Sequence, residues 1–149
     1  IQLWRGGREM DSEQIRQRVQ EYFVDGDNNC AMTALKLLSE VFDTPVDPEV
    51  VHAANCMPGA GGVGGLCGLV SGVLMFIGVW GGRRGLHRRV LAPVSKGFTE
   101  AVQQRFGSDC CRDLKPADGN GCAKLAEEML EFAIGYLTEQ LGTLENAVE

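Results

Sequence analysis

The fold of this chain is decided by residues 63–80, which read Val63-Gly-Gly-Leu-Cys-Gly-Leu-Val-Ser-Gly-Val-Leu-Met-Phe-Ile-Gly-Val-Trp80. The stretch carries no charged side chain, and its length lies at the lower edge of what spans a bilayer. Its glycines, its serine and the amphipathic segments around it favour instead the buried central helix of a bundle, over about residues 66–79. A glycine-rich loop, residues 57–65, leads directly into it.

The other long segments show apolar residues at helical intervals, and alternating strand patterns are absent. Helices are predicted over about residues 12–24, 30–44, 49–55 and 122–141, with a further helix that contains Pro93 and ends at Phe106. Residues 83–89 are predicted as a basic turn and residues 108–121 as a loop. The predicted fold class is all-α: a single-domain helical bundle of about five to six helices with a central Gly-rich buried helix. Residues 12–149 form the domain, and residues 1–11 are an N-terminal extension, since residues 1–9 show no apolar period.

Composition narrows the function classes. The chain has 20 acidic and 14 basic residues, a net charge of −6, which argues against nucleic-acid binding. No acidic residue occurs between Glu49 and Glu100. The start of the sequence lacks a signal-peptide pattern, so a cytoplasmic location is expected. In a reducing compartment, the six cysteines indicate metal binding or redox chemistry more than structural disulfides.

Three of the cysteines, Cys30, Cys67 and Cys122, fall at predicted helix starts, and Cys111 lies in the loop before the last helix. Free amides and the helix dipole at such positions favour thiolate over thiol. We therefore expect these cysteines to converge, with Cys67 as the most acidic thiol. The alternative is that they are small core residues, because free cysteine is often fully buried. Cys56 is interpreted as such a core residue.

Local spacing leaves the chemistry open. The chain has no C-x-x-C pair and no C-x-x-C-H, which excludes a thioredoxin-type motif and haem attachment. Any shared site must be gathered from distant segments. Gly68 and Gly72, one helical turn apart, predict a groove for a second helix that carries Ala34 or Ala126. We find no Ser-His-Asp or H-E-x-x-H pattern, so the sequence assigns no enzyme class.

The cysteine pattern resembles that of the C_GCAxxG_C_C family. Cys30 matches in Asn29-Cys30-Ala31, and Cys67 in Cys67-Gly68-Leu69-Val70-Ser71-Gly72, where the family has alanine in place of Leu69. Cys111 matches in the run from Phe106-Gly107 to Cys111-Arg112-Asp113, and Cys122 matches before the last helix. The resemblance covers about residues 12–141. It implies a redox-active protein in which Cys30, Cys67, Cys111 and Cys122 are the metal ligands or redox thiols.

Several functions remain open at this point. The resemblance favours an iron–sulfur cluster used for electron transfer, and four thiolates also suit zinc. The first alternative is a dithiol/disulfide protein without a metal. The second is a non-enzymatic module that binds a small anion or a partner through the glycine-rich loop and the basic turn, with structural cysteines. Gly65, Gly68 and Gly72 are the predicted cofactor-binding glycines. A redox partner is expected but not identified, and a homodimer stays open.

Overall fold

Helices make up most of the computed structural model, which describes residues 9–117 and 121–148. The five longer helices are α1 (Ser12–Val19), α2 (Cys30–Val41), α5 (Gly68–Arg83), α6 (Arg88–Phe106) and α8 (Ala123–Val148). The shorter segments are η1 (Gln20–Val24), α3 (Pro48–Ala53), η2 (Ala54–Cys56), α4 (Gly59–Gly62) and α7 (Cys111–Leu114). Within the described residues, β pairing is limited to one isolated bridge, Leu66 with Cys110. The prediction of an all-α single domain is confirmed.

Side-chain caps explain where the N-terminal helices begin. Asp11 and Gln14 form a capping box at α1, each side chain bonding the other residue's backbone N–H. Asn29 accepts from the Met32 N–H at the start of α2, and Asp47 caps α3, whose first residue is Pro48. Each cap satisfies an amide that the helix itself leaves without a partner.

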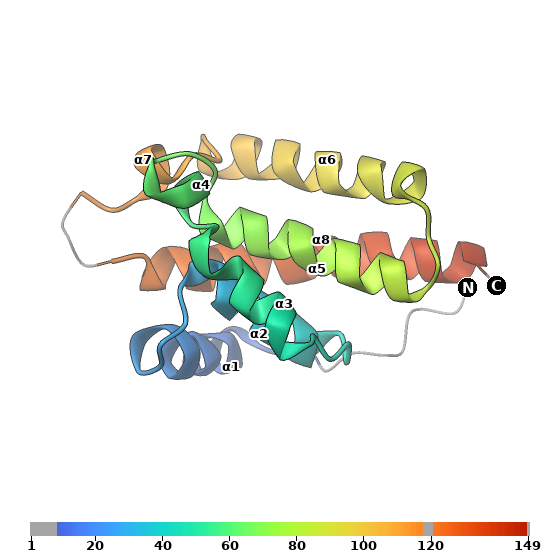
Figure 1. The fold of residues 1–149 in the computed structure, drawn as a ribbon, viewed down its shortest axis with the longest axis horizontal. Coiled ribbons are helices and arrows are strands. Elements are labelled where there is room, and N and C mark those ends of the chain that lie inside the picture. Colours follow the sequence, from blue (N-terminus) through green and yellow to red (C-terminus); the bar gives the residue numbers. More distant parts are fainter. Residues whose placement is uncertain (1–8, 118–120, 149) are drawn as a thin grey trace.

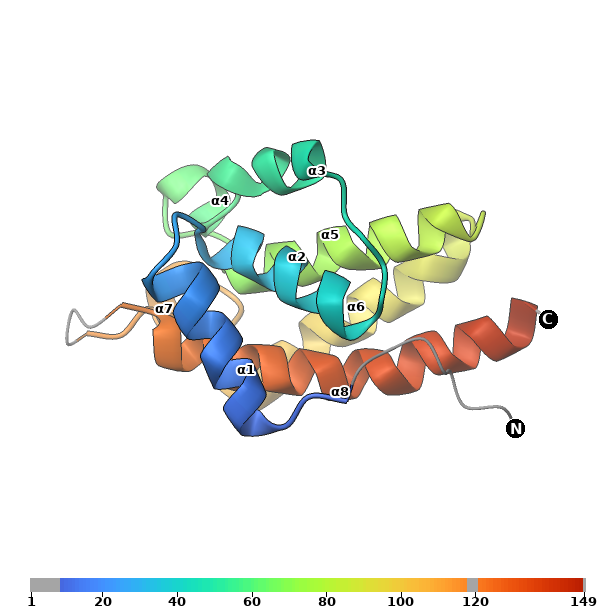
Figure 2. The same cartoon turned by 90° about the horizontal axis from the view of Figure 1, so that it is seen from below.

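The core lies where α5 meets α2, α6 and α8. α5 and α6 form an antiparallel pair joined by a short turn, and α2 lies between α3 and α8 (Figures 1 and 2). The largest fully buried side chains include Trp80, Phe76 and Phe42. On α5, however, Gly78, Gly82 and Arg83 are exposed, so this helix is not enclosed on all sides.

Several element boundaries differ from expectation. α2 ends at Val41 instead of near residue 44, and the predicted turn at residues 83–89 is shorter because α5 includes Arg83 and α6 begins at Arg88. α5 starts at Gly68 and runs four residues beyond Val79 to Arg83, and α8 continues to Val148 instead of ending near Leu141. The expected loop contains the one-turn helix α7. Of the expected extension, residues 1–8 lie outside the described part of the chain, whereas Asp11 belongs to the start of α1.

A helix that crosses a bilayer needs about 20 predominantly apolar residues. None of the described helices is both long enough and apolar enough to meet this requirement.

Candidate functional site: four cysteines at one end of the bundle

Four cysteines from separate segments meet at one end of the molecule. Cys30, Cys67, Cys111 and Cys122 line a single small space of about 20 Å³ together with Gly68, Leu69, Leu114, Lys115 and Leu125. This is the end at which α4, α7 and the start of α8 lie (Figures 1 and 2). Such a volume is close to that of one water-sized probe. The four cysteines therefore line one small, mainly apolar space.

Each of these cysteines stands at the beginning of a helix. Cys30 is the first residue of α2, Cys67 caps α5, and Cys111 is the first residue of α7. The Cys122 carbonyl accepts from the Ala126 N–H at 2.7 Å, so this residue begins the hydrogen-bonding pattern of α8. The sequence predicts such positions for Cys30, Cys67 and Cys122, but not the one-turn helix that begins at Cys111.

The position of Cys30 beside Cys67 depends on two glycines of α5. A Cβ added at Gly68 would clash with the Cys30 sulfur, and one at Gly72 would lie 2.6 Å from the Ala31 oxygen and 2.7 Å from the Ala34 Cβ. Real Cβ atoms essentially never approach that closely. The prediction that these glycines admit a second helix is confirmed, and the helix is α2, which carries Ala34.

The position of Cys111 beside Cys67 depends on backbone hydrogen bonds. The Cys67 N–H donates to the Asp109 carbonyl at 2.8 Å, and the Cys111 N–H donates to the Gly65 carbonyl at 2.6 Å. These bonds flank the Leu66–Cys110 bridge. Two distant loops are thereby joined side by side, which places one cysteine at the end of each.

The glycine-rich loop covers Cys111. Gly59 is buried at a φ of +63°, and a Cβ added there would lie 3.7 Å from the Cys111 sulfur. Its left-handed backbone suits glycine. Gly65 contributes the carbonyl that Cys111 binds, and Gly68 lines the cysteine space, whereas Gly72 contacts α2. A role of these three glycines in cofactor binding stays a prediction.

Burial makes these thiols less acidic. It raises the pKa of Cys30 to about 12, and the neighbouring Cys67 and Cys122 thiols raise it further in the same direction. Burial also raises the pKa of Cys67, although the Leu69 and Val70 amides oppose the shift. The pKa of Cys122 is raised by burial and by Cys111, while the ammonium of Lys115 lowers it. The expectation of an acidic Cys67 is therefore wrong, because desolvation of the thiolate outweighs the amides at the helix start.

The remaining two cysteines do not line this space. Cys56 is exposed, which corrects its interpretation as a core residue, and Cys110 is half-buried with its sulfur 3.6 Å from an Asp109 carboxylate oxygen. All six cysteines are free thiols. Among the described residues, no three Cys, His, Asp or Glu side chains are already spaced as metal ligands. The four thiols are thus neighbours without being a preformed ligand cage.

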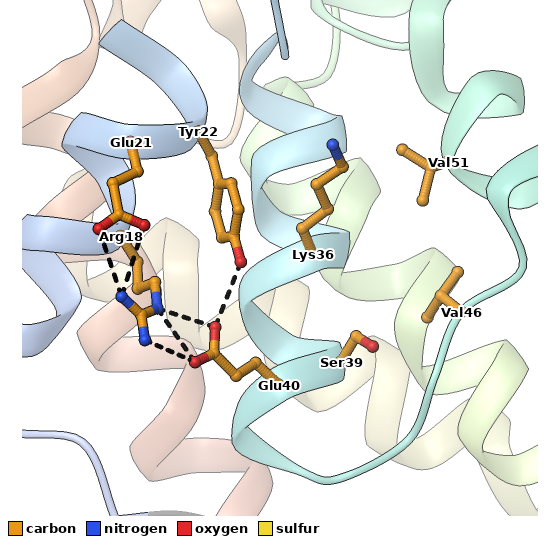
Figure 3. A pocket seen from close by; sticks show the side chains of 8 residues that line it. All are labelled: Arg18, Glu21, Tyr22, Lys36, Ser39, Glu40, Val46 and Val51. Atoms are coloured by element: carbon orange, nitrogen blue, oxygen red, sulfur yellow. Dashed lines mark hydrogen bonds and ion pairs between the residues drawn. The ribbon is translucent and has the colours of Figure 1, made fainter. Parts of the chain in front are cut away.

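A second concave feature lies elsewhere, between α1, α2 and α3. It is a groove of about 490 Å³ lined by Arg18, Glu21, Tyr22, Lys36, Ser39, Glu40, Val46 and Val51 (Figure 3). The Arg18 guanidinium donates to both Glu40 carboxylate oxygens at 2.8–3.0 Å, and Tyr22 donates to Glu40 at 3.3 Å. The Lys36 ammonium lies 5.7 Å from the Tyr22 ring centroid. These contacts tie α1 and η1 to α2, and none of the cysteines lines the groove.

Comparison with known proteins places the chain by its sequence. No curated protein and no solved structure matches it. Residues 28–136 match the sequence profile of the family described as "putative redox-active protein (C_GCAxxG_C_C)". This range includes all four cysteines that line the small space and both loops that bring them together. Because the profile covers well over half of the chain, the protein belongs to the C_GCAxxG_C_C family.

Proposed function

We propose that Cys30, Cys67, Cys111 and Cys122 form the redox centre of this protein and hold an iron–sulfur cluster for one-electron transfer. The observation that carries the proposal is the convergence of four cysteines from four separate segments on one small, mainly apolar space. Core cysteines used only as small hydrophobic residues have no reason to gather at a single point. Four cysteine sulfurs are the usual ligand set of such clusters.

The residues present fit a thiolate-bound metal centre. Leu69, Leu114 and Leu125 line the space and limit the access of water. Burial disfavours the charged thiolates, and a metal cation between them would offset this by favouring deprotonation, so loading would release protons. When bound, a cluster supplies a site that gains or loses one electron.

The chain's own groups would adjust the potential of that site. The amides of Leu69 and Val70 and the ammonium of Lys115 stabilise negative charge on the sulfurs. Among the described side chains, no three of the four cysteines are already spaced as metal ligands, so the sulfurs must shift when a metal or cluster is loaded. Zinc held by the same four thiolates would make the site structural instead of redox-active.

Dithiol chemistry is a second candidate, favoured by the free thiols of Cys30 and Cys67, which lie next to each other. Formation of a disulfide between them would transfer two electrons and two protons to an oxidant such as a disulfide-containing protein. Their raised pKa values make thiolate attack slow at neutral pH, and this favours the metal centre over the dithiol.

The test is analysis of protein purified without oxygen. We expect visible absorbance with iron and acid-labile sulfide, and loss of all three when any of the four cysteines is changed to serine. Cys56→Ser is the matched control, since this exposed thiol lies outside the site. Stoichiometric zinc without sulfide would replace the cluster with a structural site. Absence of any metal, with reversible oxidation of Cys30 and Cys67, would support the dithiol.

A further inference from the structure

The glycine-rich loop forms the outer surface of the cysteine site. Gly59 is buried against Cys111, whereas the next residues, Ala60, Gly61 and Gly62, are exposed. A Cβ added at Gly61 or Gly62 would meet nothing within 4 Å. Cys111, itself half-buried, therefore lies directly behind a loop whose next residues are exposed. A redox partner that touches the loop would therefore come close to the sulfurs.

This surface combines exposed apolar side chains with two cations. Val63 is 74% and Met57 37% exposed, which places both among the most exposed large hydrophobic residues described. The Arg112 side chain packs on Gly64 and its Nε donates to the Gly64 carbonyl at 3.2 Å. Lys115 lines the cysteine space and is itself exposed. We name Met57, Gly61–Val63, Arg112 and Lys115 the loop face.

The acidic residues of the same segment are bonded elsewhere. Asp113 accepts from the Ser108 hydroxyl at 2.7 Å, and Asp109 accepts from the Gln103 amide at 3.0 Å, next to the end of α6. Arg112 contacts the glycine-rich loop and Lys115 lines the cysteine space, while the two carboxylates are bonded to Ser108 and Gln103. On a chain whose net charge is −6, this places two exposed cations beside the cysteine site.

We propose that the loop face is the docking surface for an electron-transfer protein that presents carboxylates around an apolar centre. This inference rests on the proposed one-electron centre. Electron-transfer complexes bury small interfaces and are short-lived, and charge complementarity governs how fast they form. On docking, one electron passes between the centre and the partner's cofactor, so one is oxidised as the other is reduced, with no atom transferred.

Small charged oxidants test the electrostatic part. The dithionite-reduced protein is mixed in a stopped-flow instrument with ferricyanide or with hexaammineruthenium(III), each of which accepts one electron. Removing both charges in Arg112→Gln/Lys115→Gln should slow oxidation by the ferricyanide anion about threefold or more at low salt. The same change should speed oxidation by the ruthenium cation. Because Lys115 also adjusts the potential of the centre, a changed driving force would move both rates in the same direction, so opposite changes with the two oxidants isolate the surface charge. The effects should vanish at 0.5 M salt, where the Debye screening length is only a few ångströms.

The control is Arg83→Gln/Arg88→Gln, which removes two exposed charges from the turn at the other end of α5. We expect its rates to stay within twofold of wild type. Arg112→Lys keeps the charge but loses the guanidinium geometry, so it should retain the wild-type rate if the charge matters. The single variant Arg112→Gln is the reference for this comparison. Loss of rate in Arg112→Lys equal to that in Arg112→Gln would mean that the guanidinium only supports the loop, and would overturn the role in docking.

The apolar part is tested with an acidic protein oxidant, a flavodoxin. Val63→Ser should slow this reaction while leaving the ferricyanide rate unchanged, whereas Val90→Ser, at an exposed valine near the far turn, should change neither. If every variant with a working centre reacts at the wild-type rate, the role of the loop face in docking is overturned, whereas the proposed function is not. A chain with no reducible centre would overturn the proposed function itself and, with it, this partner.

Discussion

Replacing Gly72 by alanine tests how closely α2 and α5 must approach. A Cβ at this position lies 2.6 Å from the Ala31 carbonyl oxygen and 2.7 Å from the Ala34 Cβ. To reach an ordinary contact of about 3.5 Å, the oxygen would have to withdraw by about 0.9 Å. Neither atom is the end of a flexible side chain, so α2 itself must shift. Overpacking of this kind costs about 1–3 kcal/mol.

The matched control is Gly78→Ala on the same helix, where an added Cβ meets nothing within 4 Å. Both variants gain about 0.5–1 kcal/mol from replacing a mid-helix glycine. The difference between them therefore isolates the overpacking. We expect Gly78→Ala to be slightly more stable than wild type and Gly72→Ala to lie at least about 1 kcal/mol below Gly78→Ala in urea unfolding monitored by circular dichroism.

The same shift should reach the cysteine site, because Ala31 directly follows Cys30. Gly72→Ala should retain less metal, or oxidise Cys30 and Cys67 less readily, than Gly78→Ala. If Gly72→Ala equals Gly78→Ala in both stability and metal content, the interpretation that these small residues set the approach of the two helices is refuted.

Two further outcomes follow from the pKa of Cys30 and from the turn after α5. Because burial raises the pKa of Cys30 to about 12, its alkylation at pH 8 should be about a thousandfold slower than that of an unshifted thiol, measured by mass spectrometry after iodoacetamide pulses. The folded state holds the Cys30 proton more tightly than the unfolded state does. Its contribution to the unfolding free energy is therefore complete below about pH 9 and is lost as the pH rises toward 12. Cys30→Ala should remove this part of the loss of stability at alkaline pH. The Arg84 guanidinium lies 4.0 Å from the Trp80 ring centroid and pairs with the Glu145 carboxylate at 2.6 Å. Arg84→Ala should therefore lower the unfolding free energy, measured by urea titration, by about 1–2 kcal/mol. Arg83→Ala, at an exposed neighbour, should leave it unchanged.

Short-range features of this fold could be read from the sequence. The caps at Asp11 and Asn29 act within three residues of themselves, so their spacing alone indicates a helix start. Gly68 and Gly72 are one turn apart, and that spacing predicts a bare face whichever helix fills it. The helical starts of Cys30, Cys67 and Cys122 follow from the same local patterns.

The features that the sequence did not indicate depend on contacts between distant residues. α7 is a single turn, too short to show an apolar period. The hydrogen bonds between residues 64–67 and 109–112 involve backbone groups, which leave no signature in side-chain type. The acidity of Cys67 was misjudged for a related reason: the helix start is a local property, but the burial that outweighs it is supplied by other segments.

Cys67 is the residue through which the two halves of the site are joined. Its helix meets α2 through Gly68 and Gly72, which fixes Cys30, and its backbone N–H binds the Asp109 carbonyl, which fixes Cys111. The first connection is made by close packing and the second by hydrogen bonds, and both meet at Cys67 and its neighbour Gly68. Contacts that share a residue are coupled, so a disturbance of one should be felt at the other. Overpacking at Gly72 should therefore change the reactivity of Cys111 as well as that of Cys30, although no contact of Cys111 is touched directly.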